Sequence, residues 1–164
     1  MARRPGTPRS PVPATAASSS SAAPGLARKL GIRPDDVVAL VGAPPAWSAG
    51  ELPEGARLRR GLRGPADVVI AFLRRAADLE TVLARVVPVL GPEDSLWLAW
   101  PRKAAGHVSD LGDNLVRGAA LETGLVDVKV AAIGDDWSGL RFVWRRERRD
   151  EVRRHLAGTS PRRR

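Results

Sequence analysis

Apolar residues along the chain fall into short unbroken runs, separated by segments in which they recur at helical spacing. The runs are Val37 to Val41, Val68 to Phe72 and Leu96 to Trp100. Runs of this length between turn residues are typical of strands that are buried on both faces of a parallel sheet. The pattern therefore predicts three parallel strands in the middle of the chain.

Helical spacing occurs before the first run and between the second and third. Leu26 and Leu30 lie four residues apart, and Gly31 can adopt the left-handed conformation that ends a helix. Asp78 can cap a longer helix, which we expect to end or tighten at about Pro88 because proline lacks an amide hydrogen. The apolar positions of that helix are Leu79, Val82, Leu83, Val86 and Leu90. With the strands on either side, this helix forms a predicted βαβ unit.

The last part of the patterned region is predicted to hold one helix and one hairpin. The helix runs from about Asp110 to Thr123, with Ser109 or Asp110 as its cap and Gly124 as its end. Its expected apolar side is Leu111, Leu115 and Ala119. After the helix, apolar and polar residues alternate on both sides of a turn at residues 134–139. This alternation predicts two antiparallel strands with one face in water. The apolar positions of the hairpin are Val126, Val128, Val130, Leu140, Phe142 and Trp144.

One segment leaves two alternatives open. Residues 57–63 alternate as a charged edge strand does. Only Gly64 to Asp67 separate them from the next buried run, whereas a parallel crossover normally needs a dozen or more residues. This strand is therefore either very short or not parallel to its neighbours.

Together these elements predict an α/β fold for residues 25–144: a Rossmann-like, mostly parallel sheet with flanking helices and a C-terminal antiparallel hairpin. Residues 1–24 have almost no large apolar side chain and are expected to form a disordered tail. Residues 145–164 are expected to form a basic extension that continues as a charged helix over Arg145 to Arg154 and then grades into disorder.

The net charge of +9 comes from the two tails, because residues 25–144 hold equal numbers of basic and acidic side chains. The folded region is therefore not a basic platform for nucleic acid, and any nucleic-acid contact through the tails would be weak and salt-sensitive. The chain has no cysteine, and its histidines, His107 and His155, are too far apart to indicate a metal pair. No apolar stretch reaches membrane-spanning length, and a cytoplasmic protein without metal or membrane partner is expected.

Three stretches carry a resemblance to known proteins. They are Leu30-Gly31-Ile32 through Val41-Gly42-Ala43-Pro44-Pro45, then Trp100-Pro101-Arg102-Lys103 with Asp110 to Arg117, then Gly124 to Lys129 with Trp137-Ser138-Gly139-Leu140. They resemble a family of short bacterial proteins of unknown function, and the order of elements looks like a trimmed class I methyltransferase core. The resemblance covers about residues 25–144 and implies a Rossmann-like fold, but the family has no established activity to carry over.

The cofactor position of such a fold departs from the usual pattern. A nucleotide cofactor there lies on a glycine-rich turn after the first strand, and an acid after the second strand holds the ribose. In this chain Pro44 and Pro45 remove two amide donors from the turn, and Arg60 to Arg63 offer no carboxylate before Asp67. We therefore expect no cofactor and no more than weak binding of S-adenosylmethionine.

Polar residues gather at the carboxyl edge of the predicted sheet, where ligands of parallel sheets bind. Spacing places Asp110, Asn114 and Arg117 on one predicted helical stripe, for which a solvated face is the alternative. Trp137 lies in a predicted turn. Its side chain either forms the wall of a ligand site or is a buried plug that closes the edge of the sheet. The candidate residues for an anionic or polar ligand are Arg102, Lys103, Asp110, Asn114, Arg117, Asp136, Trp137 and Ser138. The arginines of residues 57–63 form either an anion patch or the charge that protects an edge strand.

Three functional hypotheses follow. The leading one is a non-catalytic or vestigial methyltransferase-like domain that serves as a binding or interaction module, because no nucleophile motif or phosphate-binding loop is present. The second is a small-molecule transferase that uses the cleft at the carboxyl edge of the sheet. The third is a nucleic-acid-associated protein that acts through its arginine-rich tails. Whether the protein is an enzyme stays open, with the balance against it.

Overall fold

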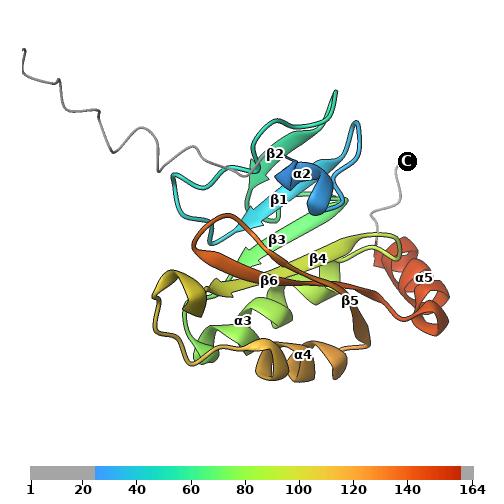
Figure 1. Cartoon of the computed structure of the whole chain (residues 1–164). Coiled ribbons are helices and arrows are strands. Elements are labelled where there is room, and N and C mark those ends of the chain that lie inside the picture. The colour runs from blue at the N-terminus through green and yellow to red at the C-terminus, as the bar shows by residue number, and fades with distance from the viewer. Residues whose placement is uncertain (1–24, 160–164) are drawn as a thin grey trace, which may run out of the picture.

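The computed structural model describes residues 25–159, so the expected disorder of residues 1–24 and of the last five residues lies outside the described part. Six strands form one sheet in the order β2-β1-β3-β4-β6-β5 (Figure 1). Their bounds are β1 Val37–Val41, β2 Arg57–Arg60, β3 Val68–Phe72, β4 Ser95–Pro101, β5 Leu125–Ala132 and β6 Trp137–Trp144. The first four strands pair in parallel, and β6 is antiparallel to both β4 and β5. The predicted Rossmann-like α/β fold with a terminal hairpin is confirmed.

Helices cover the two faces of the sheet unequally (Figure 1). The α-helices are α2 Leu26–Lys29, α3 Ala76–Val86, α4 Asp113–Leu121 and α5 Arg149–Thr159, and the 3-10 helices are η1 Val87–Val89, η2 Lys103–Ala105 and η3 Arg146–Arg148. Side chains of α3 and α4 join one core cluster with Leu96, Leu98 and Trp100 of β4. On the other face, Trp97 and Ala99 pack with α2 and with the segment that follows β1. Alternate residues of β4 thus enter opposite cores, as strand geometry requires.

The first two predicted helices form as expected. Leu26 and Leu30 are buried, and Gly31 has a φ of 77°, which is the left-handed conformation that favours glycine at a helix end. The longer helix α3 tightens at η1, which holds Pro88. Asp78 accepts a hydrogen bond from the Arg75 amide at 3.1 Å, so its carboxylate satisfies a donor at the start of α3.

The strand at Arg57–Arg60 is four residues long and parallel to β1, which resolves the two alternatives. The connection from β2 to β3 spans only residues 61–67. This connection runs along β1, where a crossover helix usually lies. The Gly61 amide bonds the Leu40 carbonyl, and the Asp67 amide bonds the Val37 carbonyl, both at 2.8 Å. An extended segment of this length reaches roughly 24 Å, more than the length of β1, so no helix is needed.

The predicted helix from Asp110 to Thr123 is wrong at its start and in its buried face. The helix α4 begins at Asp113 and is preceded by Gly112 as its cap position. Leu111 is buried but precedes the helix, and the residues that α4 buries are Val116 and Ala120, while Leu115 is 47% exposed. The reason is local, because the Ser109 hydroxyl accepts the Leu111 amide and holds this segment in a turn.

The C-terminal extension begins in a charged helix, although its bounds differ from those predicted. It starts with η3, and α5 runs from Arg149 to Thr159, beyond the expected end at Arg154. Val152 of α5 packs against the core cluster on the α3 and α4 face. The helix is therefore joined to the domain, as Figure 1 shows at the end of the sheet.

Candidate functional site

The carboxyl ends of β1, β2 and β3 meet at one edge of the sheet. After β1 the chain turns at Gly42, whose φ is 66°. Pro44 and Pro45 follow, and a hydrogen bond of 3.0 Å from the Trp47 amide to the Pro44 carbonyl closes a single turn over them. Nucleotide-binding sheets of this kind have a glycine-rich loop after the first strand, whereas this turn contains two prolines that lack an amide hydrogen.

Three aromatic rings occupy the space beside this turn. Phe72, at the end of β3, lies edge-on to Trp47 at a centroid distance of 5.2 Å and to Trp137 at 4.9 Å. The indole of Trp47 also donates to the Ile133 carbonyl at 3.4 Å. Edge-to-face contacts at these distances are favourable, so the rings close this part of the sheet edge. Of the two roles left open for Trp137, its packing on Phe72 favours the plug.

Two arginines reach over the turn from the neighbouring strands. Arg74, which follows β3, donates to the Gly42 carbonyl at 3.1 Å, and its guanidinium lies 5.8 Å from the centroid of the Trp137 ring. Arg60, the last residue of β2, donates to the carbonyls of Ala43 and Pro45 at 3.4 and 3.3 Å. Within residues 25–159, no carboxylate lies within 4.0 Å of either guanidinium. Both side chains are exposed.

One group of the predicted site residues does come together at the end of β4. The Arg102 amide donates to the Asp136 carbonyl at 2.8 Å, and Trp137 and Ser138 pair with Pro101 and Trp100 in the β4–β6 register. The Asp136 carboxylate lies 2.9 Å from His107 Nε2. Lys103 begins η2 and is exposed.

The predicted stripe of Asp110, Asn114 and Arg117 does not exist, because Asp110 precedes α4. Its carboxylate accepts the Ala76 amide at 2.8 Å and so satisfies the start of α3. Arg117 Nε lies 3.0 Å from Asp127 Oδ2, which directs this side chain to β5. Asn114 is exposed in the first turn of α4. These three residues therefore do not share one helix face as the spacing predicted.

The sequence places the turn from Gly42 to Trp47 at this edge, but it did not single out Arg74 or the edge role of Phe72. A signal for Arg74 was available, because it lies just beyond the end of a continuous apolar run, where functional side chains of parallel sheets gather. The contact between Trp47 and Phe72 could not be predicted from spacing, because it joins a loop and a strand that are distant in the chain.

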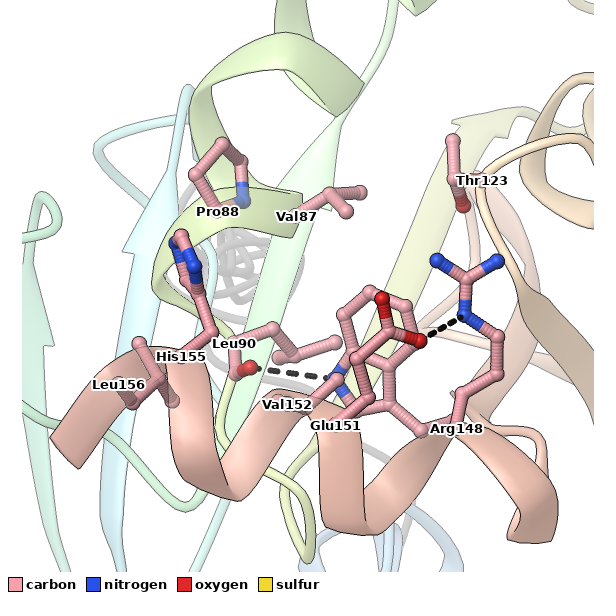
Figure 2. A pocket seen from close by; sticks show the side chains of 10 residues that line it. Val87, Pro88, Leu90, Thr123, Arg148, Glu151, Val152, His155 and Leu156 are labelled. Carbon is pink, nitrogen blue, oxygen red and sulfur yellow. Dashed lines mark hydrogen bonds and ion pairs between the residues drawn. The ribbon is translucent and has the colours of Figure 1, made fainter. Parts of the chain in front are cut away.

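Two surface pockets lie near the amino end of β4, opposite the edge described above. A pocket of about 280 Å³ lies between η1, the end of β6 and α5 (Figure 2). The Trp144 indole donates to the Leu90 carbonyl at 3.1 Å. Arg148 pairs with Glu151 at 3.5 Å, and Figure 2 shows these two side chains facing each other. A second hollow of about 600 Å³ between α3 and α4 shares Val87, Pro88 and Thr123 with the first. Because Ser95 pairs with Val143, this region lies near the amino ends of the parallel strands.

A carboxylate with a shifted pKa lies at that amino edge. The pKa of Asp94 is raised to about 6, mainly by burial and also by the charges of Asp67, Glu93 and Asp36, while a hydrogen bond from the Gly91 amide opposes the rise. That hydrogen bond is 2.6 Å long. Asp36, Asp67 and Asp94 each precede a strand, and each accepts a backbone amide. Asp36 and Asp94 thus cap local turns, and Asp67 bonds the first residue of β1. The described residues contain no group of side chains suited to hold a metal ion.

Comparison with known proteins gives a likeness of fold only. No family model matches the chain, and no curated protein matches it. Solved structures similar to it include the ribosomal protein L11 methylase from Lactobacillus delbrueckii subsp. bulgaricus, with 13% identity, a TM-score of 0.44 and coverage of 72% of this chain and 74% of that chain. A tRNA methyltransferase from B. subtilis has 12% identity, a TM-score of 0.46 and coverage of 79% and 69%.

A third similar structure is magnesium protoporphyrin IX methyltransferase from Synechocystis PCC 6803, with 12% identity, a TM-score of 0.43 and coverage of 68% of this chain and 75% of that chain. Likenesses at this level carry no argument about activity, cofactor or substrate. No helix within residues 25–159 is both long and apolar enough to cross a membrane. The strand order and the parallel pairing of the first four strands make the fold of this chain Rossmann-like.

Proposed function

We propose that the protein is a non-catalytic, methyltransferase-like binding module, in which the position of a nucleotide cofactor is occupied by the chain's own side chains. The observation that carries the proposal is the pair of contacts made by Arg74, which bonds the Gly42 carbonyl at 3.1 Å and lies over the Trp137 ring at 5.8 Å. These contacts place a guanidinium across the end of β1, where the cofactor would approach the backbone.

The rest of the edge supports the same interpretation. Pro44 and Pro45 supply no amide donors to this turn, and the end of β2 presents Arg60 in place of an acid that could hold a ribose. The positive charge of Arg60 and Arg74 also opposes the sulfonium of S-adenosylmethionine. Steric occupation, missing donors and charge therefore act in the same direction.

Titration calorimetry of the full-length protein with S-adenosylmethionine and with S-adenosylhomocysteine tests the proposal. We expect both dissociation constants to be weaker than about 1 mM, because the site lacks the donors that would repay the loss of ligand freedom. A dissociation constant in the micromolar range for either compound contradicts the proposal and supports a transferase.

The comparison of the two ligands serves as an internal control. S-adenosylhomocysteine lacks the sulfonium charge, so binding of this compound alone would show that charge, and not occupation of the site, excludes the cofactor. That result would also contradict the proposal that the chain's own side chains occupy the cofactor position, which is called the closed edge below.

A further inference from the structure

The guanidinium groups of Arg60 and Arg74 converge on one short stretch of backbone. Arg74 bonds the carbonyl of Gly42, and Arg60 bonds the carbonyl of the next residue, Ala43. Consecutive Cα atoms are about 3.8 Å apart, so the two cations lie on adjoining peptide units. They approach from opposite sides, because β2 and β3 flank β1 in the sheet.

Most of the hydrogen-bonding capacity of these arginines is left for a ligand. A guanidinium has five N–H donors, of which one contact engages Arg74 and two engage Arg60. The remaining donors belong to exposed side chains that have no carboxylate within 4.0 Å among the described residues. The carbonyl contacts fix both planar groups, so less rotamer entropy remains to be lost when an anion binds.

The acidic residues of this edge are already engaged. Asp78 pairs with Arg75 at 3.6 Å and accepts amides at the start of α3, and Asp136 pairs with His107 at 2.9 Å. Asp110 accepts the Ala76 amide. These carboxylates weaken an anion's attraction to the edge. Asp78 accepts the Arg74 backbone amide at 3.4 Å, but among the described residues no carboxylate pairs with the guanidinium of Arg60 or Arg74.

The position of Arg60 indicates which kind of anion fits. In dinucleotide-binding sheets an acid after the second strand selects a ribose diol, whereas an arginine there accommodates a phosphate. Guanidinium donors match the oxygens of phosphate in a bidentate manner, and Arg60 and Arg74 both keep free donors beside the turn that follows β1. From this geometry we infer that Arg60 and Arg74 form a binding site for a phosphate group, free or carried by a small metabolite. The inference rests on the proposed binding module and names the ligand class for its carboxyl edge.

Nuclear magnetic resonance of the ¹⁵N-labelled full-length protein tests this site, with inorganic phosphate as the probe and sodium chloride added to hold the ionic strength constant. We expect saturable shifts of the Gly42 and Ala43 amides and of the arginine Nε–H signals of Arg60 and Arg74. Because each charge-assisted contact contributes about 1.5–3 kcal/mol, Arg60→Ala and Arg74→Ala should each weaken binding about tenfold or more.

Arg57→Ala is the matched control, because Arg57 begins the same strand and its loss removes the same charge from the other edge of the sheet. We expect this variant to bind phosphate as the wild type does. Equal weakening in all three variants, or shifts spread over the surface without saturation, would show diffuse attraction and overturn the site. Adenosine 5′-monophosphate and adenosine distinguish free phosphate from a phosphorylated metabolite as the ligand. If the ligand is a phosphorylated metabolite, adenosine 5′-monophosphate should bind more tightly than inorganic phosphate, and adenosine, which has no phosphate, serves as the control.

The outcomes separate this inference from the proposed function. Failure of phosphate to bind, while S-adenosylmethionine also fails to bind, overturns the phosphate site and leaves the closed edge intact. Micromolar binding of S-adenosylmethionine contradicts the closed edge, whatever phosphate does.

Discussion

Asp94 is the residue at which burial and ionisation conflict most clearly. Its carboxylate accepts the Gly91 amide at 2.6 Å, which favours the charged form, yet burial and three neighbouring acids raise its pKa from 3.8 to about 6. The folded state therefore binds this proton more tightly than the unfolded state. Stability from this residue is present at acidic pH and falls as the pH rises from 3.8 through about 6.

The first prediction is that Asp94→Asn stabilises the protein at neutral pH. The amide oxygen can still accept from Gly91, while the cost of a partly buried charge disappears. Urea unfolding at several pH values should show a gain in the free energy of unfolding that shrinks as the pH falls below about 6. Glu54→Gln, an equal charge change at an exposed residue, should show no such dependence. A variant less stable than the wild type at neutral pH would contradict the assignment of the shift to burial.

At the scale of elements, the start of α3 depends on a residue from another segment. Asp110 accepts the amide of Ala76 at 2.8 Å and acts as an external cap. The second prediction is that Asp110→Ala lowers the free energy of unfolding by about 0.5–2 kcal/mol, the usual effect of losing a cap. Denaturant unfolding measures it, with Asn114→Ala as a control because Asn114 is exposed on α4.

If Asp110→Ala leaves stability unchanged but abolishes binding of a polar ligand, the carboxylate has the ligand role first expected from the sequence. The structural account of Asp110 would then be wrong.

The strands were predictable because burial on both faces leaves a continuous apolar run, as in Val68–Phe72, all of whose residues are buried. The start of α4 was not predictable, because Ser109 and Asp110 have the chemistry of caps but use it on other partners. In the same way, the contact of Arg74 with Gly42 joins segments 32 residues apart in sequence. Spacing within one element cannot indicate such a contact.

At the scale of the whole molecule, α5 extends the domain beyond its last strand. Val152 packs on the core, and Leu156, four residues later, helps to line the pocket over Leu90 and Trp144. Residues 155–159, which were expected to grade into disorder, therefore continue α5. The expected disorder of residues 1–24 and 160–164 lies outside the described residues and stays a prediction.

The third prediction is that a chain ending at Arg148 unfolds at a lower temperature than a chain ending at Thr159. Removal of α5 exposes the apolar pocket wall, and partial burial of Val152 and Leu156 should contribute about 2 kcal/mol. Thermal unfolding followed by circular dichroism measures the difference. Equal midpoints for the two chains would show that α5 adds nothing to the stability of the domain.

The indole contacts have a consequence for spectroscopy. The chain has five tryptophans and no tyrosine, so its near-ultraviolet emission is dominated by indole. Trp97 and Trp144 donate to the carbonyls of Leu30 and Leu90 and, like Trp100, are at most 5% exposed, whereas Trp47 and Trp137 are half-buried at the carboxyl edge. An ionic quencher thus reaches the edge pair first. The blue-shifted emission that survives quenching reports the two cores, and the quenched fraction reports the surroundings of Arg74.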